Sequence, residues 1–372
     1  MVHGHTTAAE QGVRVLSFGR EGFQELFLTA SGPGRLDVSG AVRHLGLEGG
    51  CAGAVARAEM FVPTGAKELS RAGCLAPVQE PFAVTCVIGE SAQNGHLGGV
   101  HLHAVTGRSL RPVELAGRVV GTVVETPYAT ECLLGDIRPA TPCGSRVQQA
   151  RATFEMMQEA LQCVGMQFSN VVRTWLFLDD ILSWYNEFNQ VRTTFFTEHD
   201  IFEQLVPAST GIGGSNPAGT AMVTSVFAVK PKTDQVLVQA VPSPLQCPAL
   251  EYGSSFSRAA EVAMPDHRRL FVSGTASIDP EGNTVHVGDV QGQVARTCEV
   301  VQAILQSRAM EWRDVTRATA YVRHPQDAPI FHRYCADSGI PALPVIIANN
   351  TICRDDLLFE LEVDAITASP AP

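Results

Sequence analysis

The sequence predicts an α/β protein made of three tandem copies of one small domain. A ten-residue pattern of alternating apolar and polar residues recurs three times, with an arginine at the same offset in each copy. The copies are GAVARAEMFV at 53–62, SNVVRTWLFL at 169–178 and RDVTRATAYV at 313–322, and their arginines are Arg57, Arg173 and Arg317. Segments with helical spacing flank the second and third copies. Helices that alternate with strands in this way are typical of the α/β class.

Each copy of the pattern predicts a half-buried strand, because one parity is apolar and the other polar. Further strands are expected upstream, at ELFLTASG (25–32), ECLLGDI (131–137) and RLFVSGTASID (269–279). Amphipathic helices are expected at 146–165 and 292–310, where apolar residues recur every three or four positions. The first copy has only a short glycine-rich counterpart, SGAVRHLGLEGG, which predicts a truncated helix.

Second helices are expected at 185–196 and 328–340, each followed by a Pro-Ala pair that leads into another strand. Each unit is therefore strand, helix, strand, helix, strand, with a mixed sheet packed on two helices. Linkers are expected near 115 and at the proline-rich VPSPLQCPALEYG around 241–253. The predicted domains are 1–115, which is degenerate, 116–247 and 248–372.

Composition excludes several functional classes. A net charge of −11 disfavours a nonspecific nucleic-acid or membrane surface, because phosphate binding relies on clustered Lys and Arg. The 10 cysteines include no C-x-x-C pair, so neither a zinc knuckle nor a redox dithiol is indicated. The start MVHGHTTAAEQ lacks the features of a signal peptide, and no apolar run is long enough for a membrane helix. We therefore expect a cytoplasmic protein that binds a small anionic molecule in a local basic pocket.

The order of motifs in the C-terminal third resembles the YjgF/RidA family. The carriers are LFVSG, a helix, DVTRATAYV, a second helix, a Pro-Ala pair and DLLFELEVDAI. Members of that family form trimers with active sites in the clefts between subunits. The resemblance implies three YjgF/RidA-like (chorismate-mutase-like) domains that close an intramolecular pseudo-trimer, and hence a monomer in solution.

Deaminating members of the family carry an arginine directly after the Pro-Ala pair, where it holds the substrate carboxylate. Here Ser209 and Leu343 occupy those positions. A narrower resemblance, to the chorismatases, lies in TVHVGDVQGQ (284–293), YVRHPQD (321–327) and ICRDDLLFELE (352–362). It implies hydrolysis of the enolpyruvyl ether of chorismate without a cofactor, to give pyruvate and a hydroxybenzoate or a dihydroxycyclohexadiene carboxylate. A deaminase and a ligand-binding regulator without chemistry are the alternatives.

Cleavage of an enol ether needs a proton delivered to its methylene carbon, so the acid must stay neutral near pH 7. Burial raises the pKa of a carboxyl group and supplies such an acid. Glu360 lies on the outward parity of the last strand and matches the chorismatase acid by position, and Glu362 is the weaker candidate. The simpler interpretation of Glu360 is a solvated carboxylate at a cleft edge.

The resemblance further implies basic groups for the substrate carboxylates, because Arg grips a carboxylate with two hydrogen bonds. The candidates for substrate binding are Arg173, Arg323, Arg354, Tyr321, Gly211 and Gly274. The repeated Arg173 is equally consistent with bracing the domain interfaces. Cys353 and Gly274 match positions at which hydroxybenzoate-forming chorismatases carry Cys and a small residue. No metal is expected, and His101 and His103 are interpreted as surface residues.

Overall fold

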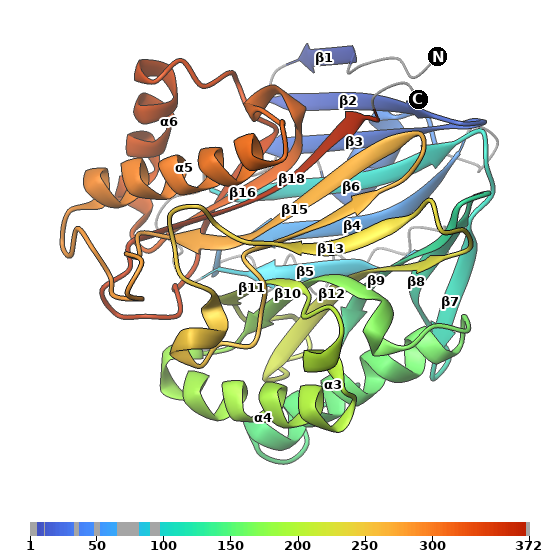
Figure 1. Cartoon of the computed structure of the whole chain (residues 1–372), viewed down its shortest axis with the longest axis horizontal. Coiled ribbons are helices and arrows are strands. Elements are labelled where there is room, and N and C mark those ends of the chain that lie inside the picture. The colour runs from blue at the N-terminus through green and yellow to red at the C-terminus, as the bar shows by residue number, and fades with distance from the viewer. Residues whose placement is uncertain are drawn as a thin grey trace.

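The computed structural model describes residues 6–10, 12–32, 37–47, 53–64, 82–89 and 97–369. Within these residues the chain forms three six-stranded sheets (Figure 1). The first unit contains β1 (Thr6–Glu10), β2 (Val13–Arg20), β3 (Phe23–Ser31), α1 (Val38–His44), β4 (Ala54–Val62), β5 (Val84–Ile88) and β6 (Gly99–Thr106). The second contains β7 (Arg111–Leu115), β8 (Arg118–Glu125), β9 (Ala129–Ile137), α3 (Arg146–Gln162), β10 (Val171–Leu178), α4 (Tyr185–Glu198), β11 (Ala208–Gly213) and β12 (Met222–Pro231). The third contains β13 (Leu237–Val241), β14 (Ala259–Ala263), β15 (His267–Ala276), α5 (Val290–Ser307), β16 (Val315–Val322), α6 (Ala328–Asp337), β17 (Val345–Asn349) and β18 (Phe359–Ala368).

All three sheets have the same topology, which confirms the tandem α/β fold. The strand orders are β1-β2-β3-β6-β4-β5, β7-β8-β9-β12-β10-β11 and β13-β14-β15-β18-β16-β17. In each sheet the last pair is parallel and the other pairs are antiparallel. The sheets change between residues 106 and 111 and between 231 and 237, the first a few residues and the second at least ten residues before the predicted divisions at 115 and 247, which remain predictions.

Capping residues in the sequence account for the positions at which α3 and α5 begin. α3 begins after Ser145, whose hydroxyl accepts from the Gln148 amide while the Gln148 side chain accepts from the Ser145 amide. α5 begins after Asp289, whose carboxylate accepts from the Gly292 amide. α1 has only seven residues, as the glycine-rich stretch predicted. Among the described residues, no helix is both long and apolar enough to cross a lipid bilayer.

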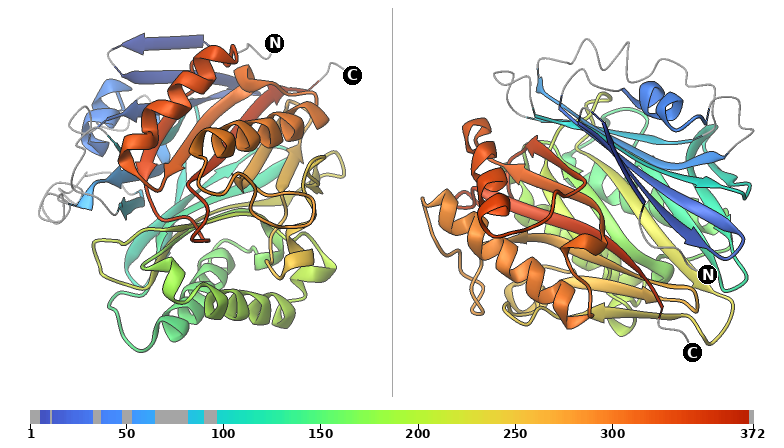
Figure 2. Two further views of the ribbon diagram at one scale, coloured as in Figure 1. Left: turned by 90° about the vertical axis from the view of Figure 1, so that its left-hand side faces the viewer. Right: turned by 90° about the horizontal axis from the view of Figure 1, so that it is seen from above.

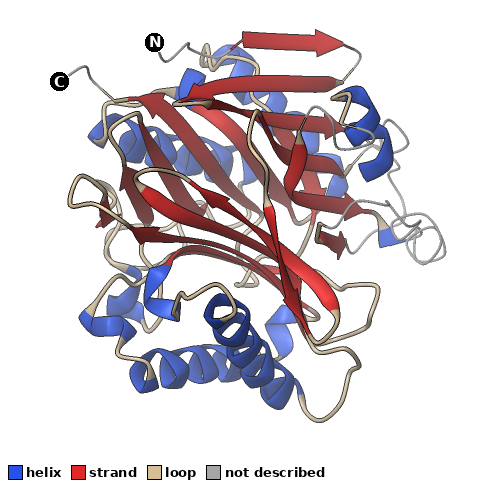
Figure 3. Ribbon diagram, turned by 90° about the vertical axis from the view of Figure 1, so that its right-hand side faces the viewer, coloured by secondary structure: helices blue, strands red, loops and turns tan. Residues whose placement is uncertain are grey.

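The three sheets face one another and the helices lie on the outside (Figures 2 and 3). The parallel edge strand of each sheet contacts the third strand of the next: β5 meets β9, β11 meets β15 and β17 meets β3. Aromatic and aliphatic side chains from all three units fill the centre, among them Phe61, Trp175, Phe177, Phe271 and Tyr321. The chain therefore closes a ring with pseudo-threefold symmetry.

The ladder registers identify which residues are equivalent in the three units. The repeated arginines pair with His103, Phe227 and Asp364 across their respective ladders. Two residues further along the same strands, Glu59, Trp175 and Thr319 are equivalent, and they pair with His101, Ser225 and Glu362. Two residues further again, the partners are Gly99, Val223 and Glu360. Among these ladder partners, only those of the third unit are acids: Asp364, Glu362 and Glu360.

Candidate active site

Glu360 lies in β18 and faces the cleft between the second and third units. It is 4% exposed, and no described residue donates a hydrogen bond to its carboxyl group. Burial raises its pKa to about 8, the charge of Glu362 acts in the same direction, and Arg173 opposes them. At pH 7 Glu360 is therefore mostly protonated and holds a proton that it can donate.

Glu362, two residues further along the strand, lies in the opposite electrostatic environment. Its carboxylate accepts from Arg173 at 2.8 Å, from Arg317 at 2.8 Å and from the Tyr321 hydroxyl at 3.2 Å, and it also contacts the Thr210 hydroxyl. Burial disfavours its charge, but the two arginines lower its pKa below the ordinary value. Two neighbouring carboxyl groups with pKa values pushed apart are an arrangement suited to acid catalysis. Glu362 is the ionised member and Glu360 the neutral one.

Glu360 opens into a cavity of about 50 Å³, which we call the chamber. Its walls come from the second unit (Tyr185, Arg192, Ser209 and Gly211) and from the third unit (Tyr252, Ser254, Phe256, Arg258, Gly274, Ala276, Ile278, Cys353, Arg354, Leu357 and Glu360). An open groove of about 680 Å³ shares Tyr185, Tyr252, Ser254, Cys353 and Arg354 with the chamber. A ligand that reaches the acid from solvent passes these shared side chains.

Three arginines of the chamber have no carboxylate partner among the described residues. Arg192 donates to the Asn189 side chain at 2.6 Å, Arg258 to the Cys247 carbonyl at 2.9 Å and Arg354 to the Gly282 carbonyl at 2.8 Å. Arg192 and Arg258 are 2% and 5% exposed. Buried charges in proteins are normally paired, so the buried Arg192 and Arg258, with the half-buried Arg354 in the same cavity, favour an anionic ligand.

Cys353 and Gly274 lie against the acid. Burial and the neighbouring Glu360 raise the pKa of the Cys353 thiol to about 12, so the thiol stays neutral. A β-carbon at position 274 would overlap Oε1 of Glu360 and would lie 3.0 Å from its Cδ. The absence of a side chain at 274 therefore leaves room for the carboxyl group. Gly211 faces the same space, 3.6 Å from the Tyr185 hydroxyl when measured from an added β-carbon.

The structure brings five of the predicted site residues into the chamber and leaves three outside it. Glu360, Cys353, Gly274, Gly211 and Arg354 line the chamber. Arg173 is fully buried and committed to Glu362 and Thr210, and Tyr321 is fully buried with its hydroxyl on Glu362. Arg323 follows β16 and donates to the Arg354 and Asp355 carbonyls and to the Asp355 carboxylate. Arg173, Tyr321 and Arg323 bond to neighbouring protein groups outside the residues that line the chamber, and their role as substrate ligands remains a prediction.

Four residues that line the chamber were not among those predicted from the sequence: Arg192, Arg258, Tyr185 and Tyr252. Tyr185 and Arg192 are seven residues apart in a predicted helix, a spacing that puts both on one face. Their common helix face was the signal from which these two residues could have been predicted to line one site. Tyr252 and Arg258 lie in or just after the proline-rich stretch that we interpreted as a linker between domains, so their role could not be recognised from the sequence.

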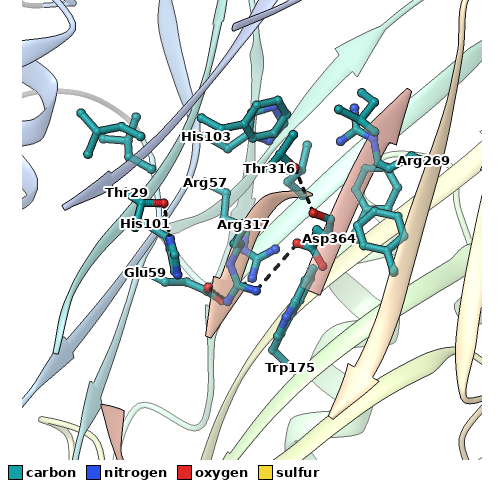
Figure 4. Close-up of a pocket in the computed structure, with 17 residues that line it drawn as sticks. Thr29, Arg57, Glu59, His101, His103, Trp175, Arg269, Thr316, Arg317 and Asp364 are labelled. Carbon is teal, nitrogen blue, oxygen red and sulfur yellow. Dashed lines mark hydrogen bonds and ion pairs between the residues drawn. The ribbon is translucent and has the colours of Figure 1, made fainter. Parts of the chain in front are cut away.

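A second cavity, of about 40 Å³, lies where the three sheets meet, and we call it the axial cavity (Figure 4). Its arginines are compensated: Arg57 and Arg317 both contact Glu59, and Arg269 contacts Glu25 at 2.7 Å. The repeated arginines Arg57, Arg173 and Arg317 lie over the ring of Trp175, at 3.3, 4.7 and 5.3 Å from its centroid. They brace the junction of the units.

The prediction that His101 and His103 are surface residues is wrong. β6 lies between β3 and β4 and turns these side chains toward the axial cavity. His101 Nδ1 lies 3.0 Å from the Thr29 hydroxyl, and His103 Nε2 lies 2.7 Å from the Glu25 carboxylate. Within the described ranges, no three His, Cys, Asp or Glu side chains are grouped as metal ligands.

Comparison with known proteins agrees with the fold. The endoribonuclease L-PSP family matches residues 141–218 and 253–367, which together are just over half of the chain. A chorismatase of Streptomyces rapamycinicus is 30% identical over 218 residues, a match that spans 52% of this chain and 64% of that protein. A chorismatase of Streptomyces hygroscopicus is 26% identical over 243 residues, 59% of this chain and 68% of that protein. A crystal structure of a chorismatase is similar with a TM-score of 0.61 and 19% identity, and covers 92% of this chain and 98% of its own.

Proposed function

Because the chain belongs to the endoribonuclease L-PSP family, the YjgF/RidA family, we propose that it is an enzyme that cleaves the enolpyruvyl ether of chorismate. The observation that carries the proposal is the chamber, in which a neutral buried carboxylic acid faces three arginines without carboxylate partners. Chorismate offers an acid-labile enol ether and two carboxylates. The similarity to two curated chorismatases supports this choice of substrate.

In the proposed mechanism Glu360 is the general acid. Its O–H donates the proton to the methylene carbon, whose new C–H bond takes the π electrons of the enol ether. The positive charge that results on the ether carbon is shared with the ether oxygen. Water that attacks the ether carbon returns one proton to the Glu360 carboxylate and leaves a hemiketal; the bond between this carbon and the ether oxygen then breaks, the hemiketal proton passes to the ether oxygen, and pyruvate and the dihydroxylated diene acid are released. A ring hydroxyl that attacks instead returns its proton to Glu360 and closes a cyclic ketal. Loss of a ring C–H proton with cleavage of one ring C–O bond then makes the ring aromatic and leaves a hemiketal, which releases pyruvate and the hydroxybenzoate.

Arg192, Arg258 and Arg354, which line the chamber, are the proposed anchors for the two carboxylates, in preference to Arg173 and Arg323, which bond to protein groups outside it. Ser209, at the position where deaminating relatives carry their arginine, lines the chamber, and its hydroxyl is engaged with Thr174 at 2.8 Å. The positive charge of this site thus comes from other elements than in a deaminase. This difference supports chorismate over a small imino acid as the substrate.

We further propose that Cys353 and Gly274, which both lie beside the acid, determine whether water or a ring oxygen captures the cation. The favoured product is 3-hydroxybenzoate. A thiol and a missing side chain leave a differently shaped space for water than two methyl groups would.

The closed ring also supports the expectation of a monomer, which light scattering would test against the chain mass of 39.8 kDa.

The experiment is direct: purified protein is incubated with chorismate, and pyruvate is measured with lactate dehydrogenase. We expect pyruvate release by the native protein and a loss of roughly 10²-fold or more in Glu360→Gln, which keeps the shape but cannot donate the proton. No pyruvate from native protein, together with deamination of 2-aminoacrylate, would establish the deaminase instead. Tight binding of chorismate without turnover would indicate a regulator.

A further inference from the structure

The connection between the first two strands differs in one unit of the three. Glu10 pairs with Val13 in the first sheet and Leu115 with Arg118 in the second, so only two residues of the sequence separate the paired residues in each. In the third sheet Val241 pairs with Ala259, and residues 242–258 intervene. We call this segment the 242–258 connection. Apart from one 3-10 helix, Ala249–Tyr252, the connection is irregular, and long irregular connections inside compact domains are usually functional.

The 242–258 connection forms one wall of the chamber. Tyr252, Ser254, Phe256 and Arg258 all line the chamber, and Tyr252 and Ser254 also line the open groove. The Ser255 hydroxyl lies 2.8 Å from the Thr193 hydroxyl of α4, which ties the connection to the second unit. Tyr252 packs on Gly282, at 3.2 Å from an added β-carbon. The connection is thus held at both sides of the cleft.

Two aromatic residues of the connection alternate with the three arginines of the chamber. The Arg354 and Arg258 guanidinium groups lie 5.3 and 5.2 Å from the centroid of the Tyr252 ring. The Arg258 and Arg192 guanidinium groups lie 5.7 and 5.8 Å from that of Phe256. Each ring therefore contacts two cations that come from different elements of the fold.

Cation–π contact explains how such a row is stable without a ligand. Like charges in a buried site repel one another, and the face of an aromatic ring attracts each cation within about 6 Å. A ring between two guanidinium groups also keeps them at a fixed separation. Because the hydrogen bonds of the three arginines go to neutral acceptors, their charge remains available to an anion with more than one carboxylate.

We propose that Tyr252 and Phe256 are positioning residues that space the three arginines of the chamber for a ligand with two carboxylates. The 242–258 connection is then the element that makes this cleft selective for dianions. The inference rests on the proposed function for the choice of this cleft, but it concerns binding selectivity and not turnover.

Calorimetric titration of the native protein with isophthalate and with benzoate tests it, because these probes share a ring and differ by one carboxylate. We expect isophthalate to bind at least about tenfold more tightly than benzoate. Tyr252→Leu should reduce this ratio to about 1–2, while Tyr252→Phe, which keeps the ring, should retain it. Tyr334→Leu, which removes a tyrosine from α6 outside the chamber, is the matched control and should also retain the ratio. Should Tyr252→Leu fail to fold, Phe256→Leu gives the same comparison.

Equal affinities of the native protein for the two probes, or an unchanged ratio in Tyr252→Leu, would overturn the inference. Pyruvate release from chorismate is measured separately on the same preparations. A protein that prefers isophthalate but releases no pyruvate would retain this inference and lose the proposed reaction. A protein that releases pyruvate but binds isophthalate and benzoate equally would retain the proposed reaction and lose this inference.

Discussion

Substitution of Gly274 by alanine acts directly on the proposed acid. The added methyl group would overlap Oε1 of Glu360 and lie 3.2 Å from Cγ2 of Thr210, so the Glu360 side chain is the group that has to give way. The carboxyl group must therefore rotate or move by roughly 1 Å, a displacement that costs on the order of 10²-fold when the geometry of a reacting group is lost. Overpacking of this kind destabilises the fold by about 1–3 kcal/mol.

The assay is release of pyruvate from chorismate by Gly274→Ala at saturating and limiting substrate. We expect the main loss in kcat, because the acid is displaced while the three arginines are not touched. Gly211→Ala is the matched control, since its β-carbon would lie 3.6 Å from the Tyr185 hydroxyl, an ordinary contact, and should change kcat by only a few-fold.

A double variant separates this mechanism from a general disturbance. In the Glu360→Gln background Gly274→Ala should cost little further activity, because the group through which it acts is already disabled. A Gly274→Ala enzyme with kcat within threefold of native, or an additive loss in the double variant, would refute the argument that Gly274 makes room for the acid.

Three further predictions follow from the same geometry. Because the folded-state pKa of Glu360 is raised from 4.5 to about 8, the native protein should lose stability as pH rises from about 4.5 to 8, and Glu360→Gln should lose less over that window in thermal melts at each pH. An identical pH dependence of the two proteins would contradict the raised pKa. Arg258→Ala should raise the KM for chorismate by roughly 10²-fold, whereas Arg323→Ala, whose partners are Arg354 and Asp355, should leave it within about twofold; the reverse order would restore Arg323 as the anchor. Cys353→Ala leaves the carboxyl group of Glu360 in place and should shift part of the product toward the dihydroxylated diene acid, which mass spectrometry distinguishes by one additional water; an unchanged product ratio would remove Cys353 from product selection.

The repeat and its elements could be predicted from sequence because they depend on local periodicity. The spacing of Val294, Cys298, Val301 and Leu305 predicts the buried face of α5. Alternation in VVRTWLFL predicts a strand, but the expectation that this strand is half-buried is wrong: every residue of β10 is buried, because its outward face packs against the other units. The same parity argument identified Glu360 as facing the cleft. These inferences need no knowledge of how distant segments meet.

The direction in which a buried arginine points could not be predicted in this way. Arg173 and Arg323 have the right chemistry for a carboxylate, but Glu362 and Asp355 are their partners, and these lie far away in the sequence. Arg258 lies beside a proline-rich stretch that resembles a linker, and only the folded chain shows that this stretch covers the acid. The site depends on long-range pairing, which a single sequence does not display.

At the pseudo-threefold axis, equivalent positions hold Trp175, Glu59 and Thr319. An assembly of three identical subunits would have to place three tryptophans there, too large for one small space, or three glutamates, which repel one another. Covalent linkage of the units removes this constraint, because a single substitution then changes one position and not three. The chain can therefore carry an indole at the centre, a carboxylate beside it and a proton donor in one cleft. A homotrimer cannot carry different residues at equivalent positions in this way.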